Sequence, residues 1–139
     1  KTIDDDNAGR YRQQNVLISG ASTSPPDYTL LNDKMAQLVD WYNTQANLLH
    51  PIERAAKVHA DFVGIHPFID GNGRTSRLLM NLELMKAGYP PCVITVENRL
   101  AYYEALDQWM AYGKTEAFIQ LVSAAVLEGF KPYQVVLNL

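Results

Sequence analysis

The chain has 139 residues, of which 47% are hydrophobic, and a formal net charge of −3 at neutral pH. This length and apolar content predict one compact domain with a real core rather than two. The negative balance argues against nucleic acid as the main partner, since phosphate-backbone binders are usually basic, and no apolar stretch approaches the ~20 residues that a bilayer requires.

The first expected element is a β-hairpin that follows a polar N-terminal stretch. The residues Val16, Leu17 and Ile18 form a short apolar run that is typical of a strand. The turn-rich stretch 19–26, which ends with Pro25 and Pro26, would form the turn and the returning arm. This is the one hairpin candidate in the sequence.

Helices are expected over most of the remaining chain. One helix over about 27–43 has the apolar residues Leu31, Met35, Leu38 and Tyr42 on one face, and Pro51 fits the first turn of the next helix, which leads to His66. Further helices are predicted from Arg74 to Gly88, over about 97–112 and over about 115–128. In the helix after Arg74, the apolar face is predicted to be formed by Leu78, Leu79, Leu82 and Met85. We therefore expect a mainly α-helical bundle with one β-hairpin.

The run HPFIDGNGRTSR, residues 66–77, is the most informative segment. Gly71 and Gly73 lack a Cβ, so the backbone between them can turn tightly and point its N–H groups at an anion. Asn72 tolerates a left-handed conformation and offers side-chain donors. Because this turn leads into a helix, the helix N-terminus and its macrodipole would favour phosphate.

The charged residues of the run suggest specific roles. Arg74 and Arg77 lie on one helical stripe and can hold further phosphoryl oxygens. Asp70 is a hard oxygen ligand, suited to a Mg²⁺ ion that is shared with substrate phosphates. His66 titrates near neutrality and is a natural proton acceptor for an incoming hydroxyl.

Each of these features taken singly has an ordinary structural explanation, but together, in this order, they indicate a phosphate-handling site. A metal pair formed by His59 and His66 is disfavoured, because seven helical residues separate them by about 10 Å along the axis. We expect His59 to be a packed structural residue.

The segment 66–77 matches the signature HPFx[DE]GNGRxxR of Fic-domain proteins, a family that moves AMP from ATP onto protein hydroxyls. The similarity extends to GRYRQQNVLISG near the start and to LLMNLELMKAGYPP, so the resemblance covers about residues 9–125. It implies a single Fic domain over 1–139, with a hairpin that acts as a flap and a C-terminal helical tail over about 126–139.

The resemblance also implies roles for individual residues. ATP would be bound by the residues Phe68, Gly71, Asn72, Gly73, Arg74 and Arg77, with Tyr102 and Tyr103 on the adenine side. Asp70 would hold Mg²⁺, and His66 would take the proton from a Ser, Thr or Tyr hydroxyl of a target protein. The flap residues Val16, Leu17 and Ile18 would dock an extended target segment through main-chain bonds.

Three alternatives stay open. The first is transfer of another group, since relatives move UMP or phosphocholine or phosphorylate their targets. The second is hydrolysis of the AMP-protein bond. The third is a nucleotide-sensing interaction module without turnover, which His66 and Asp70 disfavour because a binding-only module has little use for a general base.

Many relatives of this kind carry an inhibitory helix with the pattern [ST]xxxE[GN], whose glutamate pairs with the second arginine, here Arg77. Glu128 is the one candidate, but the residue four positions before it is Ala124, and the serine lies one step further back at Ser123. A displacement of one residue rotates the hydroxyl by about 100° on a helix. We expect Arg77 to have no intramolecular glutamate partner, and the restraint to lie on another segment or on an antitoxin-like protein.

The single Cys92 excludes an internal disulfide and fits a reducing compartment. We expect a cytoplasmic protein of bacterial origin. The first residue is Lys1, so an upstream targeting segment stays open. The oligomeric state, including a homo-oligomer, also stays open.

Overall fold

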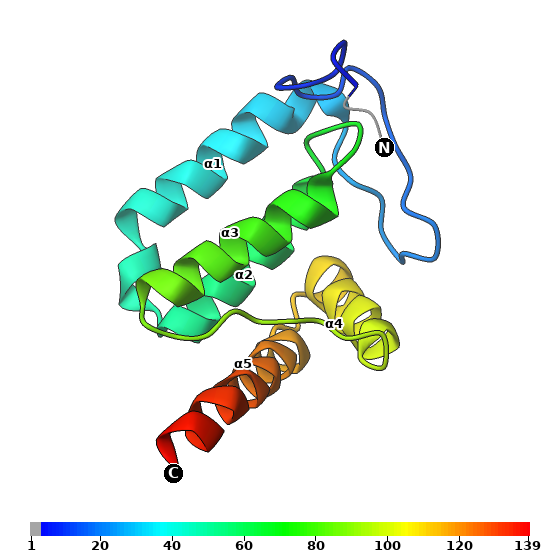
Figure 1. Cartoon of the computed structure of the whole chain (residues 1–139). Coiled ribbons are helices and arrows are strands. Elements are labelled where there is room, and N and C mark those ends of the chain that lie inside the picture. Colours follow the sequence, from blue (N-terminus) through cyan, green and yellow to red (C-terminus); the bar gives the residue numbers. More distant parts are fainter. Residues whose placement is uncertain (1–3) are drawn as a thin grey trace.

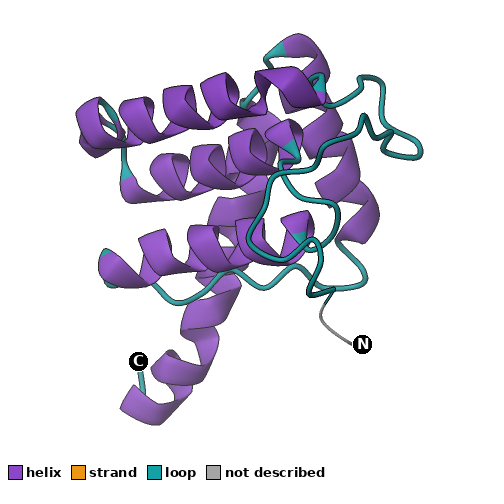
Figure 2. Ribbon diagram, turned by 90° about the horizontal axis from the view of Figure 1, so that it is seen from above, coloured by secondary structure: helices purple, strands orange, loops and turns teal. Residues whose placement is uncertain are grey.

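The computed structural model describes residues 4–139, and the regular elements in this range are helices (Figures 1 and 2). The α-helices are α1 (Leu31–Thr44), α2 (Pro51–Ile65), α3 (Asn72–Lys86), α4 (Arg99–Tyr112) and α5 (Glu116–Leu137). Short 3-10 turns at Tyr28–Leu30 and Ala46–Leu48 precede α1 and α2. The prediction of a mainly helical domain is confirmed. None of the helices in residues 4–139 has both the length and the apolarity to cross a bilayer.

Helix α2 is the centre of the bundle, because it contacts each of the other four α-helices. Pro51 occupies its first turn, and the His50 side chain caps it by accepting the N–H of Ile52 at 3.2 Å. The α2 face toward its neighbours includes Ala55, Ala56 and Ala60, all fully buried. These small side chains let the neighbouring helices approach closely, and α2 therefore gives a rigid support to His66, which follows its last residue.

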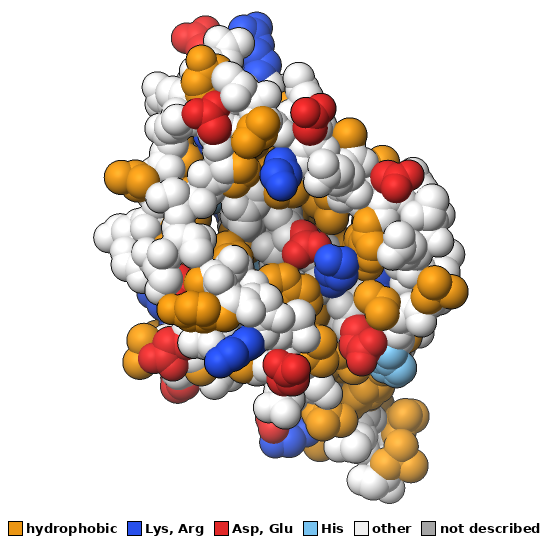
Figure 3. Space-filling view, turned by 180° about the vertical axis from the view of Figure 1, so that it is seen from behind, with side chains coloured by type: hydrophobic (Ala, Val, Ile, Leu, Met, Phe, Trp, Pro, Cys, Tyr) orange, Lys and Arg blue, Asp and Glu red, His pale blue; other side chains and the backbone are white. Residues whose placement is uncertain are grey.

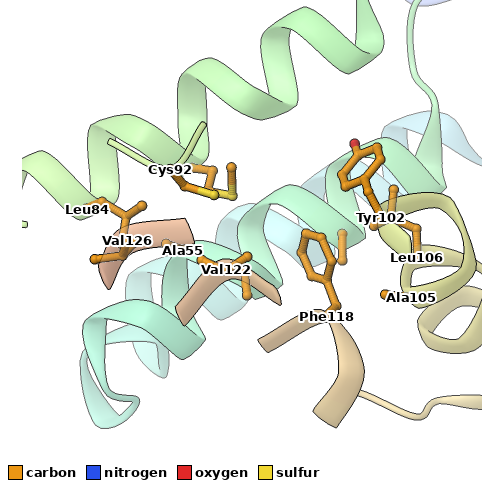
Figure 4. Packing of buried hydrophobic residues seen from close by; sticks show 12 residues of the cluster. Ala55, Leu84, Cys92, Tyr102, Ala105, Leu106, Phe118, Val122 and Val126 are labelled. Atoms are coloured by element: carbon orange, nitrogen blue, oxygen red, sulfur yellow. The ribbon is translucent and has the colours of Figure 1, made fainter. Parts of the chain in front are cut away.

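The core lies where α2, α3, α4 and α5 meet, around the ring of Phe118 (Figure 4). Phe118 is fully buried, and its ring centroid lies 5.3 Å from that of His59 and 6.0 Å from that of Tyr102. Burial of one such aromatic side chain contributes ~1.5–3 kcal/mol to the free energy of unfolding. The core thus fixes α4 and α5 against the helix that leads to His66.

The predicted apolar face of α3 is wrong. Leu78, Leu82 and Met85 are 71%, 52% and 61% exposed, whereas the buried α3 residues are Asn72, Ser76, Met80, Glu83 and Leu84. Hydrophobic periodicity missed this face because three of its five members are polar. Their polar atoms are satisfied by hydrogen bonds within the fold, which makes their burial tolerable.

The predicted β-hairpin does not form, and residues 4–139 contain no strand. Val16 and Ile18 are half-buried and Leu17 is exposed, as in an extended segment, but no second strand pairs with them. Pro25 and Pro26 lack the N–H groups that a ladder would need from the returning arm.

Side-chain hydrogen bonds hold this loop in place of a ladder. Asn15 donates to Asp27 Oδ2 at 2.9 Å and accepts the N–H of Tyr28 at 2.9 Å. Near the tip, the N–H of Ser22 donates to Asp107 Oδ1 at 2.7 Å, which fastens the loop to α4. The segment is therefore a pinned loop, which we call loop 14–26.

The predicted end of the last helix at Gly129 is also wrong, since α5 continues through Gly129 and Pro132 to Leu137. Gly129 is a point of close approach and not a cap: a Cβ there would lie 3.1 Å from Pro90 Cβ. Pro132 removes one intrahelical hydrogen bond, but it does so in an exposed part of the helix where water can bond the freed carbonyl. Gly113, by contrast, ends α4 with a φ of 65°, as predicted.

Candidate functional site

The turn between α2 and α3 carries His66 and is held together by the side chain of Asn72. Asn72 is 2% exposed, and its Oδ1 accepts the N–H of Phe68 at 2.9 Å while its Nδ2 donates to the Phe68 carbonyl at 2.8 Å. The Asn72 side chain therefore shapes the turn, and the contact of Asn72 with phosphate stays a prediction.

Phe68 lies in an aromatic cluster and not in an open pocket. Its ring centroid lies 5.9 Å from that of Tyr11 and 6.1 Å from that of Phe62. Both backbone polar groups of Phe68 are bonded to Asn72. The structure thus gives Phe68 an anchoring position in the turn, and its contact with the nucleotide stays a prediction.

The N-terminus of α3 presents open hydrogen-bond donors. Gly71 caps the helix with a φ of 85°, a conformation that glycine adopts without strain, and no side chain caps the first turn. Among residues 4–139, no acceptor bonds the N–H groups of Asn72, Gly73 or Arg74. A Cβ built at Gly73 meets nothing within 4 Å, so the space above this residue is open. This geometry suits an anion that approaches the backbone directly.

Two charged side chains flank this opening. Asp70 Oδ1 accepts the N–H of Gly71 at 2.7 Å, and Asp70 Oδ2 accepts a bond from Arg74 Nη2 at 3.1 Å. The side chains of Asp70 and Arg74 are 61% and 66% exposed, and an ion pair this exposed contributes only about 0–1 kcal/mol. Both side chains therefore stand at the surface beside the open N–H groups of α3.

Arg77 is exposed, and its guanidinium carbon lies 5.9 Å from the centroid of the Tyr102 ring. Tyr102 is buried, and its hydroxyl is hydrogen-bonded to His59 Nε2 at 2.7 Å. Burial raises the pKa of Tyr102 to about 12 and lowers the pKa of His59 to about 4, so both groups are neutral at physiological pH. The structural role expected of His59 is confirmed, since it holds the ring on which Arg77 rests.

The two tyrosines differ in position. Tyr103 is 56% exposed, and its ring centroid lies 5.2 Å from that of Tyr102. Only Tyr103 can therefore contact a ligand over a broad area, whereas Tyr102 supports Arg77 from below.

His66 has the geometry of a proton acceptor. It is half-buried and its Nδ1 is buried, so we assign the proton-accepting role to Nε2. Burial lowers the pKa of His66, the Val63 backbone works in the opposite direction, and the charge of Arg12 lowers the pKa further. The imidazole is therefore neutral at pH 7 and able to accept a proton.

Sequence reasoning missed Arg12, which is 2% exposed and donates to carbonyl groups beside His66. No local pattern could have revealed it, because these carbonyls lie more than fifty positions away in the chain.

Asp70 is the carboxylate that we consider as a ligand for a metal ion at this site. Within residues 4–139, no group of three or more His, Cys, Asp or Glu side chains could hold a metal ion. Asp70 is a hard oxygen donor at the edge of the anion opening, which fits a Mg²⁺ ion that completes its shell with substrate oxygens and water.

A separate cleft of about 520 Å³ lies between α1, α2 and α4. Its lining includes Trp41, Lys57, Asp61 and Trp109 and contains no residue of the 66–77 segment. Figure 3 shows that the corresponding face is hollowed near its centre, with charged side chains of both signs at the rim. Residues 66–77 thus lie outside this cleft.

Glu128 pairs with Lys131 at 2.7 Å, and both side chains are exposed. Across residues 4–139, no carboxylate lies within ion-pair distance of Arg77. The Glu128 carboxylate is thus engaged by Lys131, and its effect on Arg77 stays a prediction.

Comparison with known proteins connects this geometry to a family. Residues 1–84 match the Fic/DOC family. Protein adenylyltransferase Fic of Nematostella vectensis is 46% identical over 117 residues, which cover 84% of this chain and 27% of that protein. Protein adenylyltransferase fic-1 of Caenorhabditis elegans is 44% identical over 100 residues, which cover 71% of this chain and 19% of that protein. The chain thus spans roughly a fifth to a quarter of the length of these relatives.

Solved structures share the fold. Fic-1 of C. elegans, residues 134–508, superposes with a TM-score of 0.82 and 36% identity, over 97% of this chain and 39% of that chain. A Fic domain containing signaling protein from Bacteroides thetaiotaomicron gives a TM-score of 0.79 and 32% identity, over 87% of this chain and 52% of that chain. With its signature turn, its helical fold and a family match over more than half of its length, this chain belongs to the Fic/DOC family.

Proposed function

We propose that this domain transfers AMP from ATP to the hydroxyl of a Ser, Thr or Tyr side chain in a target protein and releases pyrophosphate. One observation carries the proposal: the open N-terminus of α3, with three unbonded N–H groups within residues 4–139 and two arginines, follows directly on a turn that bears a neutral, half-buried His66. The names of the curated relatives support it, although this chain covers only part of their length.

The phosphates of ATP would be held by the first turn of α3. The N–H groups of Asn72, Gly73 and Arg74 can bond phosphoryl oxygens, and the helix dipole favours the negative charge. Arg77 rests on the Tyr102 ring, so its planar fork is partly ordered before a ligand arrives. A protein of the same fold, BepC of Bartonella tribocorum, was solved with bound AMPPNP; at 22% identity this likeness extends to the fold alone.

His66 would activate the target hydroxyl. Its Nε2 accepts the hydroxyl proton as the oxygen attacks the α-phosphorus, so a new P–O bond forms to the target. The bond from the α-phosphorus to the oxygen that bridges it to the β-phosphorus breaks, and the electron pair leaves with pyrophosphate. His66 suits this step because its lowered pKa keeps it unprotonated at pH 7.

Asp70 would hold Mg²⁺ together with the phosphates of the substrate. When bound there, the ion would offset negative charge on the phosphate oxygens. Asp70 suits this role because its carboxylate is a hard oxygen donor and is exposed beside the first turn of α3.

Loop 14–26 would receive the target. It lies beside the 66–77 turn, its Leu17 is 84% exposed, and its backbone is not engaged in a sheet. An extended target segment could therefore pair with its main chain, as in β-strand addition.

The test is incubation of the domain with ATP, Mg²⁺ and lysate proteins, with the label placed either on the α-phosphate or on the γ-phosphate. Transfer of the α-label, together with an AMP adduct in mass spectra and its absence with His66→Ala, is the expected result. Transfer of the γ-label would instead identify a kinase, and adducts obtained only with UTP or CDP-choline would identify another transferred group. Loss of label from a protein that already carries AMP would indicate the reverse reaction.

A further inference from the structure

Arg12 is a buried cation whose partners are main-chain carbonyl groups. Its Nε donates to the His66 carbonyl at 2.8 Å, and Nη2 donates to the carbonyls of Pro26 at 2.6 Å and Ile65 at 3.5 Å. Nη1 donates to the Gln14 carbonyl at 2.9 Å. The guanidinium thus joins three segments that are distant in sequence.

Two of these carbonyls flank the residue that we assign as the base. The Ile65 carbonyl belongs to the peptide before His66, and the His66 carbonyl belongs to the peptide after it. The backbone N–H of Arg12 also donates to the Pro67 carbonyl at 2.8 Å, so Arg12 bonds three consecutive peptide groups. The direction in which the His66 side chain leaves the backbone is set by these peptides.

His66 needs such support because its own backbone conformation is unfavourable. Its φ of 52° and ψ of 57° are left-handed, a region that L-residues rarely occupy. It also precedes Pro67, and a residue before proline prefers an extended conformation. Unfavourable conformations of this kind persist only where surrounding contacts determine them, and they cluster at active sites.

The same guanidinium closes loop 14–26 at both of its ends. Gln14 and Pro26 are the first and last residues of the loop, and Arg12 binds the carbonyls of both. A displacement of the Arg12 side chain would therefore disturb the loop and His66 together.

The charge of Arg12 is unusual for a group so buried. Within residues 4–139, no carboxylate lies within ion-pair distance of it, and burial lowers its pKa while the more distant charge of Asp27 works against this. A planar fork with five donors can serve several carbonyls at fixed angles, which neither a lysine nor a glutamine can match.

We propose that Arg12 is a positioning residue that holds His66 and loop 14–26 in one shared geometry, so that the base and the docked target hydroxyl meet in register. This inference rests on the proposed function. Arg12 does not contact the N–H groups of residues 72–74 or the side chains of Arg74 and Arg77, so ATP binding should not depend on it.

The experiment compares Arg12→Gln and Arg12→Lys with the wild-type domain in AMP transfer to a protein. Because a misplacement of about 1 Å can cost on the order of 10²-fold in rate, we expect kcat to fall by about 10- to 100-fold in Arg12→Gln. The KM for ATP should stay within about twofold, as expected when ground-state binding of the nucleotide is untouched. Arg12→Lys should recover only part of the loss, since it keeps the charge but not the fork.

Arg54→Ala provides the matched control for loss of stability. Arg54 is another partly buried arginine of the bundle, but its Nε pairs with Glu83 at 3.0 Å, away from the 66–77 turn. Thermal unfolding is recorded for all variants, and rates are measured where each is fully folded. We expect Arg54→Ala to lower the melting temperature and to keep the wild-type kcat.

An NMR titration measures the pKa of His66, which should not change if Arg12 only stabilises the fold. Besides burial and the Val63 backbone, the charge of Arg12 acts on His66 and lowers its pKa. The pKa of His66 should therefore rise in Arg12→Gln and stay near the wild-type value in Arg12→Lys. If Arg12→Gln does not fold, Arg12→Lys still tests the role of the fork through its kcat.

The proposal is overturned if Arg12→Gln, or Arg12→Lys where the glutamine variant is unfolded, transfers AMP with the kcat of the wild type. It is also overturned if Arg54→Ala loses kcat to the same extent. A wild-type domain that transfers no group would refute the proposed function instead. In that case the His66 titration decides whether Arg12 controls this residue, and an unchanged pKa in Arg12→Gln would refute that too.

Discussion

The two ends of α3 use polar groups in opposite ways. At the N-terminal end, Arg74 and Arg77 are exposed, and the first N–H groups bond no acceptor within residues 4–139. In the C-terminal half, Glu83 is 4% exposed and fully bonded. Its Oε1 accepts bonds from the Tyr42 hydroxyl at 2.6 Å and from Lys86 at 3.2 Å, and its Oε2 accepts a bond from Arg54 at 3.0 Å.

This contrast separates activity from stability along a single helix. Donors left open at the surface are available to a ligand and contribute little to folding, whereas a buried carboxylate must be paired or it destabilises the fold. Changes at the exposed Arg74 and Arg77 should therefore alter turnover with little effect on unfolding. Changes around Glu83 should do the reverse.

The largest effect on the rate is expected at His66, just before the N-terminal end of α3. His66→Ala removes the proton acceptor, and loss of a general base commonly lowers the rate by ~10²–10⁴-fold. ATP should still bind, because the phosphate donors lie on residues 72–77, and calorimetric titration checks this. Activity within about threefold of the wild type would refute the assignment of the base.

In the C-terminal half of α3, Glu83→Gln should lower the free energy of unfolding and leave the rate of AMP transfer unchanged. It removes a buried charge and leaves Arg54 without its counter-ion, a type of change that destabilises by about 3–5 kcal/mol. Urea unfolding measures the loss, and kcat per folded molecule should be unchanged. The control is Glu128→Gln, which breaks the exposed pair with Lys131 and should change the free energy of unfolding by less than about 1 kcal/mol. Equal losses in the two variants would contradict the contrast.

Residues 66–77 could be predicted from the sequence far better than the cluster around Glu83. Residues 66–77 are contiguous, so the glycine turn, the helix start and the charged groups could be derived from local chemistry. The Glu83 cluster joins α1, α2 and α3, and the carbonyl partners of Arg12 lie up to 54 residues away in sequence. Such contacts exist only after the chain has folded, and periodicity cannot reveal them.

The errors in the predicted fold have the same origin. Glycine is the residue that most often ends a helix, but Gly129 lies inside α5, where its lack of a side chain permits close approach to Pro90. Val16 to Ile18 have the composition of a strand, but no second strand pairs with them. The apolar face of α3 was misassigned because its buried side includes polar residues that tertiary partners satisfy. In each case tertiary contacts, made or missing, decided the outcome against a local preference.

His59, which lies between the two ends beneath Tyr102, should make stability depend on pH. Burial lowers its folded-state pKa from 6.5 to about 4, so the unfolded chain binds more protons between these values. The free energy of unfolding should therefore fall as the pH drops below about 6.5, by about 3 kcal/mol on reaching pH 4. His59→Gln should flatten this acid limb in urea titrations at several pH values. A wild-type limb that persists in the variant would assign the effect to other groups.

The smallest effect is expected at Glu128, which belongs to neither end of α3. Its carboxylate bonds Lys131 at 2.7 Å on the exposed surface of α5, and no carboxylate of residues 4–139 pairs with Arg77. Glu128→Gly should therefore leave AMP transfer unchanged within about twofold. Because a glycine inside a helix costs about 1 kcal/mol of stability, Glu128→Ala is the better-behaved companion and should give the same rate. A tenfold rise in both variants would correspond to ~1.4 kcal/mol of released restraint and would identify Glu128 as an inhibitory residue. A rise in Glu128→Gly alone would trace the effect to helix flexibility, since only that variant loosens α5.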